Sequence, residues 1–320
     1  MADSILQQIS SQFKSISAED WKNKIIKDLK GEQFEKLISQ TTDEIEILPF
    51  YTEETTKDFR LKIPEKQTAN WSITEKIVVE NIVKANADSL HALQNGANCI
   101  LFDLHKQPLS TDDINQLTDG ILIDVAPVYF YNYVNNNKTD LEKAVPNSCI
   151  DPVIVQQQDS AVNELTDALQ QALKSSYSSS YFHFYIGQNY FLEIAKFRAF
   201  RWLWHQLAAL NKIQDTVFII AETGNSNRVA SEKEIYNNML RNTTEAMSAV
   251  LGGCDYLIIN SHDVAAENSD FGKRIARNVQ HILQQESYFS DMPDLAKGSY
   301  YIEYLTYQLA NKTWKKLQCI

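Results

Sequence analysis

Few side chains in this sequence have the type and spacing that a catalytic or binding site requires, and the best placed of them follow apolar runs. His262 and Asp263 come after the run from Asp255 to Ile259, where a parallel barrel would present functional groups. The sequence shows no convergent partner for them, so a plain loop is the simpler interpretation. His183 lies within the aromatic run "YFHFYI" and is predicted to be a hydrogen-bonded core histidine.

The stretch "FDLHKQP" places Asp103 two residues before His105. In cobalamin proteins the pattern Asp-x-His-x-x-Gly marks a histidine that reaches cobalt. Pro108 stands here where that pattern requires glycine, and the stretch ends a strand of the main repeat instead of opening a separate flavodoxin-like domain. We therefore interpret His105 as a solvent-facing histidine at the mouth of a barrel.

Two further patterns have structural explanations. Glu193, Lys196 and Arg198 lie close together along one predicted helix, so an intrahelical ion pair is expected. The segment "IAETGNSN" contains one glycine, which is too few for a phosphate-binding cradle. No Ser-His-Asp set and no clustered carboxylates stand out, so the side chains alone define no reaction.

The composition excludes several classes of function. Lys and Arg total 30 against 41 Asp and Glu, a formal net charge of -11, which argues against a nucleic-acid-binding surface. Four cysteines, Cys99, Cys149, Cys254 and Cys319, form no CxxC pair, so no metal site is expected. The N-terminal stretch resembles no secretory signal, and no run of about 18 apolar residues predicts a membrane span. We expect a cytoplasmic protein without a membrane partner.

From about Trp71 onward, apolar strand-like runs alternate with helical segments, which predicts a parallel sheet with helical crossovers. Seven runs are visible, and a weak eighth lies near Phe289–Leu295. Residues 71–320 have the length of a (β/α)8 TIM barrel, roughly 250 residues. An open doubly wound sheet is the alternative.

Residues 1–70 are predicted to form a helical and extended arm, and residues 131–148 a polar loop. The seven strand candidates are "WSITEKIVVE", "NCILFDL", "GILIDVAP", "CIDPVIV", "YFHFYI", "TVFIIAE" and "DYLIIN".

One helix-to-strand passage is especially clear. Between Leu240 and Ile259, small residues such as Ala246 and Ala249 predict a helix that packs close to the sheet. Gly252 and Gly253 then predict its end, because glycine adopts the left-handed conformation without a Cβ clash.

Several motifs together resemble methylmalonyl-CoA mutase, and within that family its small (beta) subunits. They occur in the family's order from about residue 20 to residue 318, and the C-terminal half is the most specific. The motifs are "DWKNKIIKDLKG", "ILPFYTEE", "YFLEIAKFRAFRWLW", "AETGN", "YNNMLRNTTEAMSAVLGG", "RIARNVQHILQQES" and "GSYYIEYLTYQLANKTW".

The resemblance implies a TIM barrel that, in catalytic chains, receives acyl-CoA through its centre and is capped by adenosylcobalamin bound to a separate C-terminal domain. That domain has no counterpart in this sequence. Val264 stands where the family carries a glutamate that holds the cofactor's ribose, and an isopropyl group cannot accept a hydrogen bond. Ile154 and Val155 occupy the expected Tyr-His positions that contact the acyl group. The CoA-binding strand corresponds to Phe218–Gly224, which lacks arginine and histidine.

The resemblance therefore implies a non-catalytic small subunit of a mutase heterodimer, with adenosylcobalamin bound by the large (alpha) subunit. The alternative is an independent acyl-CoA-binding barrel or acyl-CoA mutase. An amphipathic N-terminal segment is expected to contact the large subunit, although packing on its own barrel would also bury it. Its apolar residues are Trp21, Ile25, Ile26, Leu29, Phe34, Leu37 and Ile38.

Overall fold

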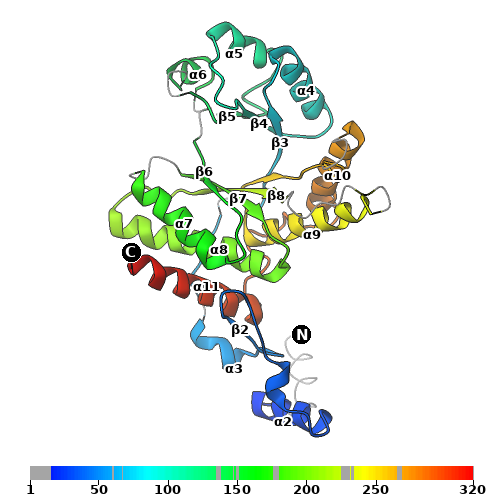
Figure 1. Cartoon of the computed structure of the whole chain (residues 1–320), viewed down its shortest axis with the longest axis vertical. Helices are drawn as coiled ribbons and strands as arrows, with labels where there is room; N and C mark the ends of the chain where they lie inside the picture. The colour runs from blue at the N-terminus through cyan, green and yellow to red at the C-terminus, as the bar shows by residue number, and fades with distance from the viewer. Residues whose placement is uncertain are drawn as a thin grey trace, which may run out of the picture.

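The structure is a computed structural model that describes residues 16–59, 61–66, 68–134, 138–146, 148, 151–175, 180–224, 231, 234–264 and 269–319. Helices cover a curled parallel sheet in its main body, and an N-terminal arm extends from that body (Figure 1). The strands of the sheet are β3 (Ser72–Val78), β4 (Cys99–Asp103), β5 (Val128–Tyr131), β6 (Val153–Val155), β7 (Tyr181–Ile186), β8 (Phe218–Thr223) and β9 (Tyr256–Ile258). The helices of the body are α4 (Ile82–Gln94), α5 (Thr111–Leu117), α6 (Lys138–Ala144), α7 (Ala161–Lys174), α8 (Tyr190–Asn211), α9 (Asn237–Gly252), α10 (Asp270–Gln285) and α11 (Tyr300–Gln318).

The sheet has the strand order of a TIM barrel. Its order is β5-β4-β3-β9-β8-β7-β6, and every neighbouring pair is parallel. Strands that follow each other in the chain are therefore neighbours, except β5 and β6, which form the two ends of the sheet, and β3 pairs with β9. The predicted α/β class and barrel order are confirmed, with seven strands among the described residues that form a half-barrel.

The weak eighth strand predicted near Phe289–Leu295 is wrong, because these residues form turns. Asp291, Pro293 and Asp294 disfavour a strand there. The following helix, α11, packs against α7 and α8 instead of closing the ring between β9 and β3. The seam between β3 and β9 is thus left without a βα unit of its own among the described elements.

The body has two lobes, each with its own apolar core. One core joins β3, β4 and β5 to α4, α5 and α6, and the other joins the remaining strands to α7–α11. Figure 1 shows the first lobe at the top of the view, where β3 connects it to the rest. Because β3 pairs with β9 only through Ser72 and Ile73, the lobes share a short stretch of sheet.

Glycine decides how closely α9 approaches α8. A Cβ on Gly252 would lie 2.9 Å from the Cβ of Phe197, so a larger residue would push the helices apart. Gly253 then ends α9 with φ 90°, a conformation that L side chains rarely adopt. Both predictions for this passage, the small helix face and the glycine stop, are confirmed.

Two other predictions are wrong. The apolar run "GILIDVAP" is not a strand, because the Leu122 carbonyl accepts hydrogen bonds from the amides of both Val125 and Ala126 in a turn. The strand begins after Pro127 instead, as β5. The predicted polar loop at 131–148 contains α6, which is anchored by the buried side chain of Leu141. One apolar anchor is too few to show helical periodicity in a sequence.

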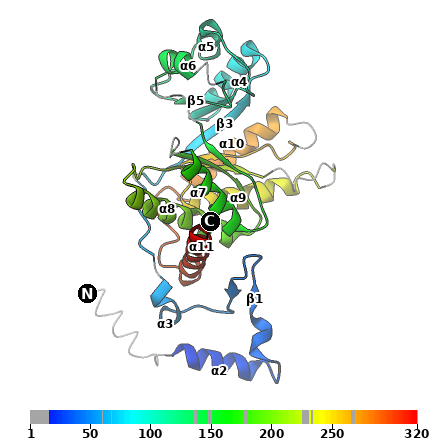
Figure 2. The ribbon, with the colours of Figure 1, turned by 60° about the vertical axis from the view of Figure 1, so that its left-hand side comes forward.

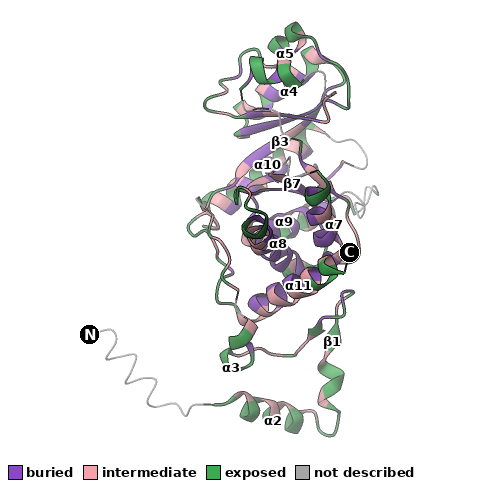
Figure 3. Cartoon of the chain, turned by 90° about the vertical axis from the view of Figure 1, so that its left-hand side faces the viewer, coloured by how far each residue is buried: buried purple, intermediate pink, exposed green. Residues whose placement is uncertain are grey.

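The N-terminal arm is fixed to the body at one end only. Its elements are α2 (Ala18–Asp28), the 3-10 helices η1 (Phe34–Leu37) and η2 (Lys57–Phe59), β1 (Ser39–Gln40), β2 (Glu46–Ile47) and α3 (Glu53–Thr56). Asp43 caps the N-terminus of α7 by accepting from the amides of Ala161 at 3.0 Å and Val162 at 3.3 Å. Helix α2 stands apart from the body and contains no buried residue (Figures 2 and 3). Residues 1–15, the beginning of the predicted arm, lie outside the described residues.

None of the described helices has the length and apolar content needed to cross a bilayer. Cys99 and Cys254 are buried free thiols, and Cys319 is an exposed one. Cys149 lies outside the described residues.

The Asp43 cap generates a stability prediction. Replacing Asp43 with Ala leaves helix amides of α7 without an acceptor and should lower the free energy of unfolding by about 1 to 2 kcal/mol. Urea denaturation followed by circular dichroism measures this change. Glu46→Ala, at an exposed acid of the same hairpin, is the matched control and should have little effect. Equal losses in both variants would contradict the capping role.

Candidate functional site

The C-terminal ends of the strands are the place where TIM barrels carry their functional groups. Side chains alternate along each strand between the interior and the helix-covered face. On β8, Ile219 and Ala221 pack in the outer core, whereas Ile220 faces the interior. Glu222 therefore also faces the interior, at the end of β8.

Glu222 is the centre of a buried polar cluster. Lys76 Nζ of β3 lies 2.5 Å from its Oε1, and His183 Nε2 of β7 lies 2.9 Å from its Oε2. Asn260 Nδ2 donates a hydrogen bond to Oε1 at 3.1 Å. Burial alone would raise the pKa of Glu222, but the contacts and charges of His183 and Lys76 outweigh it and lower the pKa to about 2. The carboxylate is therefore ionised at neutral pH and surrounded by protein groups.

A second polar group, centred on Asp103 of β4, belongs to the other lobe's strands. Tyr131 donates its hydroxyl to Asp103 Oδ2 at 2.8 Å, and Asn132 Nδ2 donates to Oδ1 at 2.9 Å. Burial, followed by the charge of Asp103, raises the pKa of Tyr131, so this phenol stays protonated as a donor. The exposed ring of His105 lies 3.9 Å from Asp103, which agrees with the solvent-facing position predicted for it.

Tyrosines occupy the barrel axis beside these polar groups. The hydroxyls of Tyr129 and Tyr256 lie 3.1 Å apart, and the ring centroids of Tyr129 and Tyr181 lie 6.1 Å apart. Because β5 is not a neighbour of β7 or β9 in the sheet, these contacts cross the interior. Burial raises the pKa of Tyr181 to about 12, as expected where water is scarce. The apolar side chains of the same cluster are Leu101, Ile154, Ile220 and Ile258.

Where these tyrosines meet, the barrel interior is thus a packed core, as in most TIM barrels. Of the residues singled out in the sequence, Ile154 packs in this interior cluster, whereas Val155 belongs to the outer core. Val264 lines a pocket between β3 and β9. Asp263 accepts a hydrogen bond from the amide of Ser269, the N-cap residue of α10, at 3.2 Å.

The sequence reading missed Lys76, Glu222 and Asn260. Glu222 is the one charged residue of β8, whereas Lys76 of β3 directly follows Glu75, and Lys76 and Glu222 are 146 positions apart. The sequence did contain a hint, because both residues lie near the C-terminal ends of their strands, at alternating positions whose side chains face the barrel interior. Their pairing could not be found without knowing that β3 and β8 flank the same strand. For His183 the predicted burial is confirmed and Nε2 lies 2.9 Å from Glu222, but neither ring nitrogen has a hydrogen-bond partner among the described residues, so the predicted hydrogen bonding is not observed.

Helix α8 carries buried ion pairs outside the interior. Lys196 lies 2.7 Å from Glu193, which confirms the expected intrahelical pair, and 2.6 Å from Glu164 of α7. Arg198 does not join them, since it points to the opposite side and lies 2.8 Å from Glu303 of α11.

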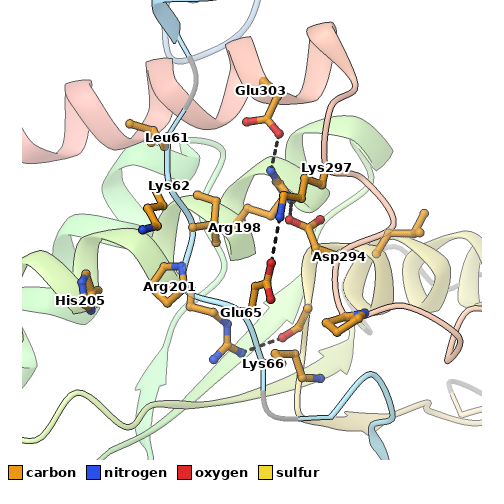
Figure 4. A pocket seen from close by; sticks show the side chains of 16 residues that line it. Leu61, Lys62, Glu65, Lys66, Arg198, Arg201, His205, Asp294, Lys297 and Glu303 are labelled. Atoms are coloured by element: carbon orange, nitrogen blue, oxygen red, sulfur yellow. Dashed lines mark hydrogen bonds and ion pairs between the residues drawn. The ribbon is translucent and has the colours of Figure 1, made fainter.

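Figure 4 shows Arg198 between Glu303 and Asp294, beside a pocket of about 420 Å³ near the N-terminal ends of the strands. Arg201, in the same pocket, pairs with Asp255 at 2.8 Å and caps α9 by donating to the Gly253 carbonyl at 2.8 Å. The pocket's arginines thus hold α11 and α9 in place. Among the described residues, no group of at least 3 His, Cys, Asp or Glu side chains is arranged to hold a metal ion.

Comparisons with known proteins agree with the motifs. Residues 165–320 match the family model described as methylmalonyl-CoA mutase. The methylmalonyl-CoA mutase small subunit of Porphyromonas gingivalis is 29% identical over 97% of this chain and 63% of that protein. The chain is similar to methylmalonyl-CoA mutases over these stretches. The resemblance inferred from the motifs is therefore confirmed.

The match to other mutases is shorter and higher in identity. Methylmalonyl-CoA mutase of Rhizobium meliloti is 45% identical over 42% of this chain and 19% of that protein. The methylmalonyl-CoA mutase large subunit of Propionibacterium freudenreichii subsp. shermanii is 41% identical over 42% of this chain and 19% of that protein. The matched region thus spans less than two thirds of each of these relatives.

Among solved structures, dihydropteroate synthase of Xanthomonas albilineans covers 68% of this chain and 93% of its own, with 13% identity and a TM-score of 0.38. A likeness of this size carries no functional argument.

The Glu222 cluster predicts how stability depends on pH. Its folded pKa of about 2 lies below the ordinary value of 4.5, so its contribution is complete above about pH 5 and is lost as pH falls toward 2. The free energy of unfolding of the unaltered chain should fall by on the order of 3 kcal/mol more than that of Glu222→Gln over this range. Urea denaturation at several pH values tests this.

Glu65→Gln provides the control for Glu222→Gln. Glu65 pairs with Lys297 at 2.8 Å, but both side chains are exposed, so this pair should contribute little. The same pH slope in Glu222→Gln as in the unaltered chain would contradict a depressed pKa at Glu222.

Proposed function

We propose that this chain is the small, structural subunit of an adenosylcobalamin-dependent methylmalonyl-CoA mutase. The heterodimer would interconvert methylmalonyl-CoA and succinyl-CoA, and this chain alone would not catalyse the reaction. The observation that carries the proposal is the tyrosine-filled axis. Tyr129, Tyr181 and Tyr256 contact one another where the family resemblance implies that acyl-CoA passes.

The residues near the mouth do not fit the family's cofactor. Val264 offers no acceptor for a ribose hydroxyl. Ile154 and Val155 offer no proton donor to an acyl group, and Val155 is turned away from the interior. Lys76 and His183, the nearest polar candidates, are both engaged by Glu222. We therefore assign adenosylcobalamin to the large subunit and derive no reaction step for this chain.

The N-terminal arm supports a partner subunit. Trp21 is 49% exposed, Ile26 43% and Leu37 41%, although each lies in a helical segment of the arm. The ring of Trp21 contacts Phe50 of the same arm, with centroids 6.3 Å apart. An apolar helix face held away from its own barrel is the feature expected of a subunit contact. The arm is thus proposed to pack against the large subunit.

Ligand binding by the isolated chain tests the structural role. Because the axis is filled, calorimetric titration with methylmalonyl-CoA or with adenosylcobalamin should show no binding. Binding at a micromolar Kd, about −8 kcal/mol, would refute the proposal and favour an independent acyl-CoA-binding barrel. The large subunit titrated under the same conditions is the positive control.

Co-expression with the large subunit of the same genome tests the partner and the arm. The chain of residues 1–320 should co-purify with the large subunit and support mutase activity. A stable heterodimer buries about 2,000 Å² or more, an area to which the arm would contribute. A chain that lacks residues 1–60 should co-purify less well. Failure of the chain of residues 1–320 to co-purify contradicts the pairing. Equal recovery of both chains contradicts only the role of the arm.

A further inference from the structure

The seam between β3 and β9 opens into a pocket toward the C-terminal ends of these strands. The two strands pair at Ser72 with Tyr256 and at Ile73 with Leu257, and then diverge. The pocket between them has a volume of about 520 Å³ and is walled by α4 and α10 as well as by both strands. Figure 1 shows β3 leaving the lower strands for the upper lobe at this point.

Backbone groups of both strands face this seam. Ser72 donates its amide to the Asp255 carbonyl, on the β9 side, whereas Val79 donates to the Asp103 carbonyl, on the β4 side. Since successive residues of a strand point their amides to opposite sides, Lys76 and Val78 direct theirs toward the seam. By the same alternation Ile259 directs its amide toward β3. These amides have no hydrogen-bond partner among the described residues.

An extended peptide is the ligand that pairs best with these backbone groups. Two facing strand edges present alternating donors and acceptors, and only another strand pairs with both. In a closed barrel with this strand order, the eighth strand would occupy this position. Helix α11, which follows the turns at Phe289–Leu295, packs on α7 and α8 and so leaves the seam unfilled by its own unit.

The lining indicates what kind of peptide fits. It contains as many lysine and arginine side chains as carboxylates, and Arg277 of α10 already pairs with Glu75 of β3 at 3.2 Å. Charge therefore gives little selectivity, and recognition would come from the backbone. Because the slot narrows to a paired sheet at Ser72, small uncharged side chains fit best at its closed end.

We propose that the β3–β9 seam binds an extended segment of the large subunit, which adds a short strand between β3 and β9. The inference rests on the proposed heterodimer and names a contact separate from the arm.

The matched variants Val78→Pro and Val78→Thr test the seam. Proline removes the amide that faces the seam without removing a described internal hydrogen bond, whereas threonine retains it. The dissociation constant of each variant with the large subunit is measured by biolayer interferometry. Val78→Pro should bind three- to tenfold more weakly than Val78→Thr, as expected for one lost hydrogen bond. Equal affinities overturn the proposal.

Hydrogen–deuterium exchange on the unaltered chain gives a second test that needs no variant. On assembly with the large subunit, the amides of Lys76, Val78 and Ile259 should become protected, whereas those of Glu75 and Ile77, paired with β4, are protected already. A complex that forms without this protection overturns the seam and leaves the heterodimer intact. Protection in the isolated chain shows that this chain covers its own seam and also overturns the proposal. Absence of any complex removes both the seam contact and the proposed function.

Discussion

A carboxylate that is removed from water must find its counter-charges inside the protein, and this constraint organises the barrel interior around Glu222. Lys76 comes from β3 in one lobe, and His183 comes from β7 in the other. The Lys76–Glu222 ion pair therefore ties β8 to β3, a strand with which it does not pair in the sheet. Breaking one partner would leave an uncompensated buried charge, which is strongly destabilising. The cluster thus links the two lobes where the backbone pairing is short.

The tyrosine contacts reinforce this link from beside the charged cluster. Tyr129 of one lobe meets Tyr181 and Tyr256 of the other, so the lobes share an aromatic core across the axis. Offset and edge-to-face aromatic pairs stabilise such contacts beyond the area they bury. The same rings occupy the space that the mutase resemblance assigns to substrate. Stability of the half-barrel and the proposed loss of substrate binding therefore have one physical cause.

The proposed structural role also explains how the molecule uses its surface. Buried ion pairs of α8 hold α7 and α11 in place, so the lower lobe is a rigid support. Asp43 fastens the second part of the arm to α7, while the apolar face of α2 remains outside the core. A rigid body with a projecting apolar helix is suited to holding a partner. The seam between β3 and β9 supplies a second surface of different chemistry.

Local patterns in the sequence determined most of the fold. Alternating apolar runs and helical segments predicted the parallel α/β order, and Gly252 and Gly253 marked the end of α9, because these signals arise within a few residues of chain. The turn before Pro127 and the short helix α6 were not predicted correctly, because neither a turn nor a helix with a single apolar anchor produces a periodic sequence pattern. The sequence motifs likewise identified the similarity to mutases without reference to geometry.

The site was decided by tertiary structure. Lys76, Glu222 and His183 belong to three different strands far apart in the chain, and nothing local in the sequence connects them. They meet because parallel strands from distant parts of the chain align their C-terminal ends and turn every second side chain inward. The missing eighth strand has both a local and a tertiary side, since Asp291, Pro293 and Asp294 disfavour a strand and α11 packs against α7 and α8. Sequence determines which side chains are available, whereas strand order and register decide which of them share the interior.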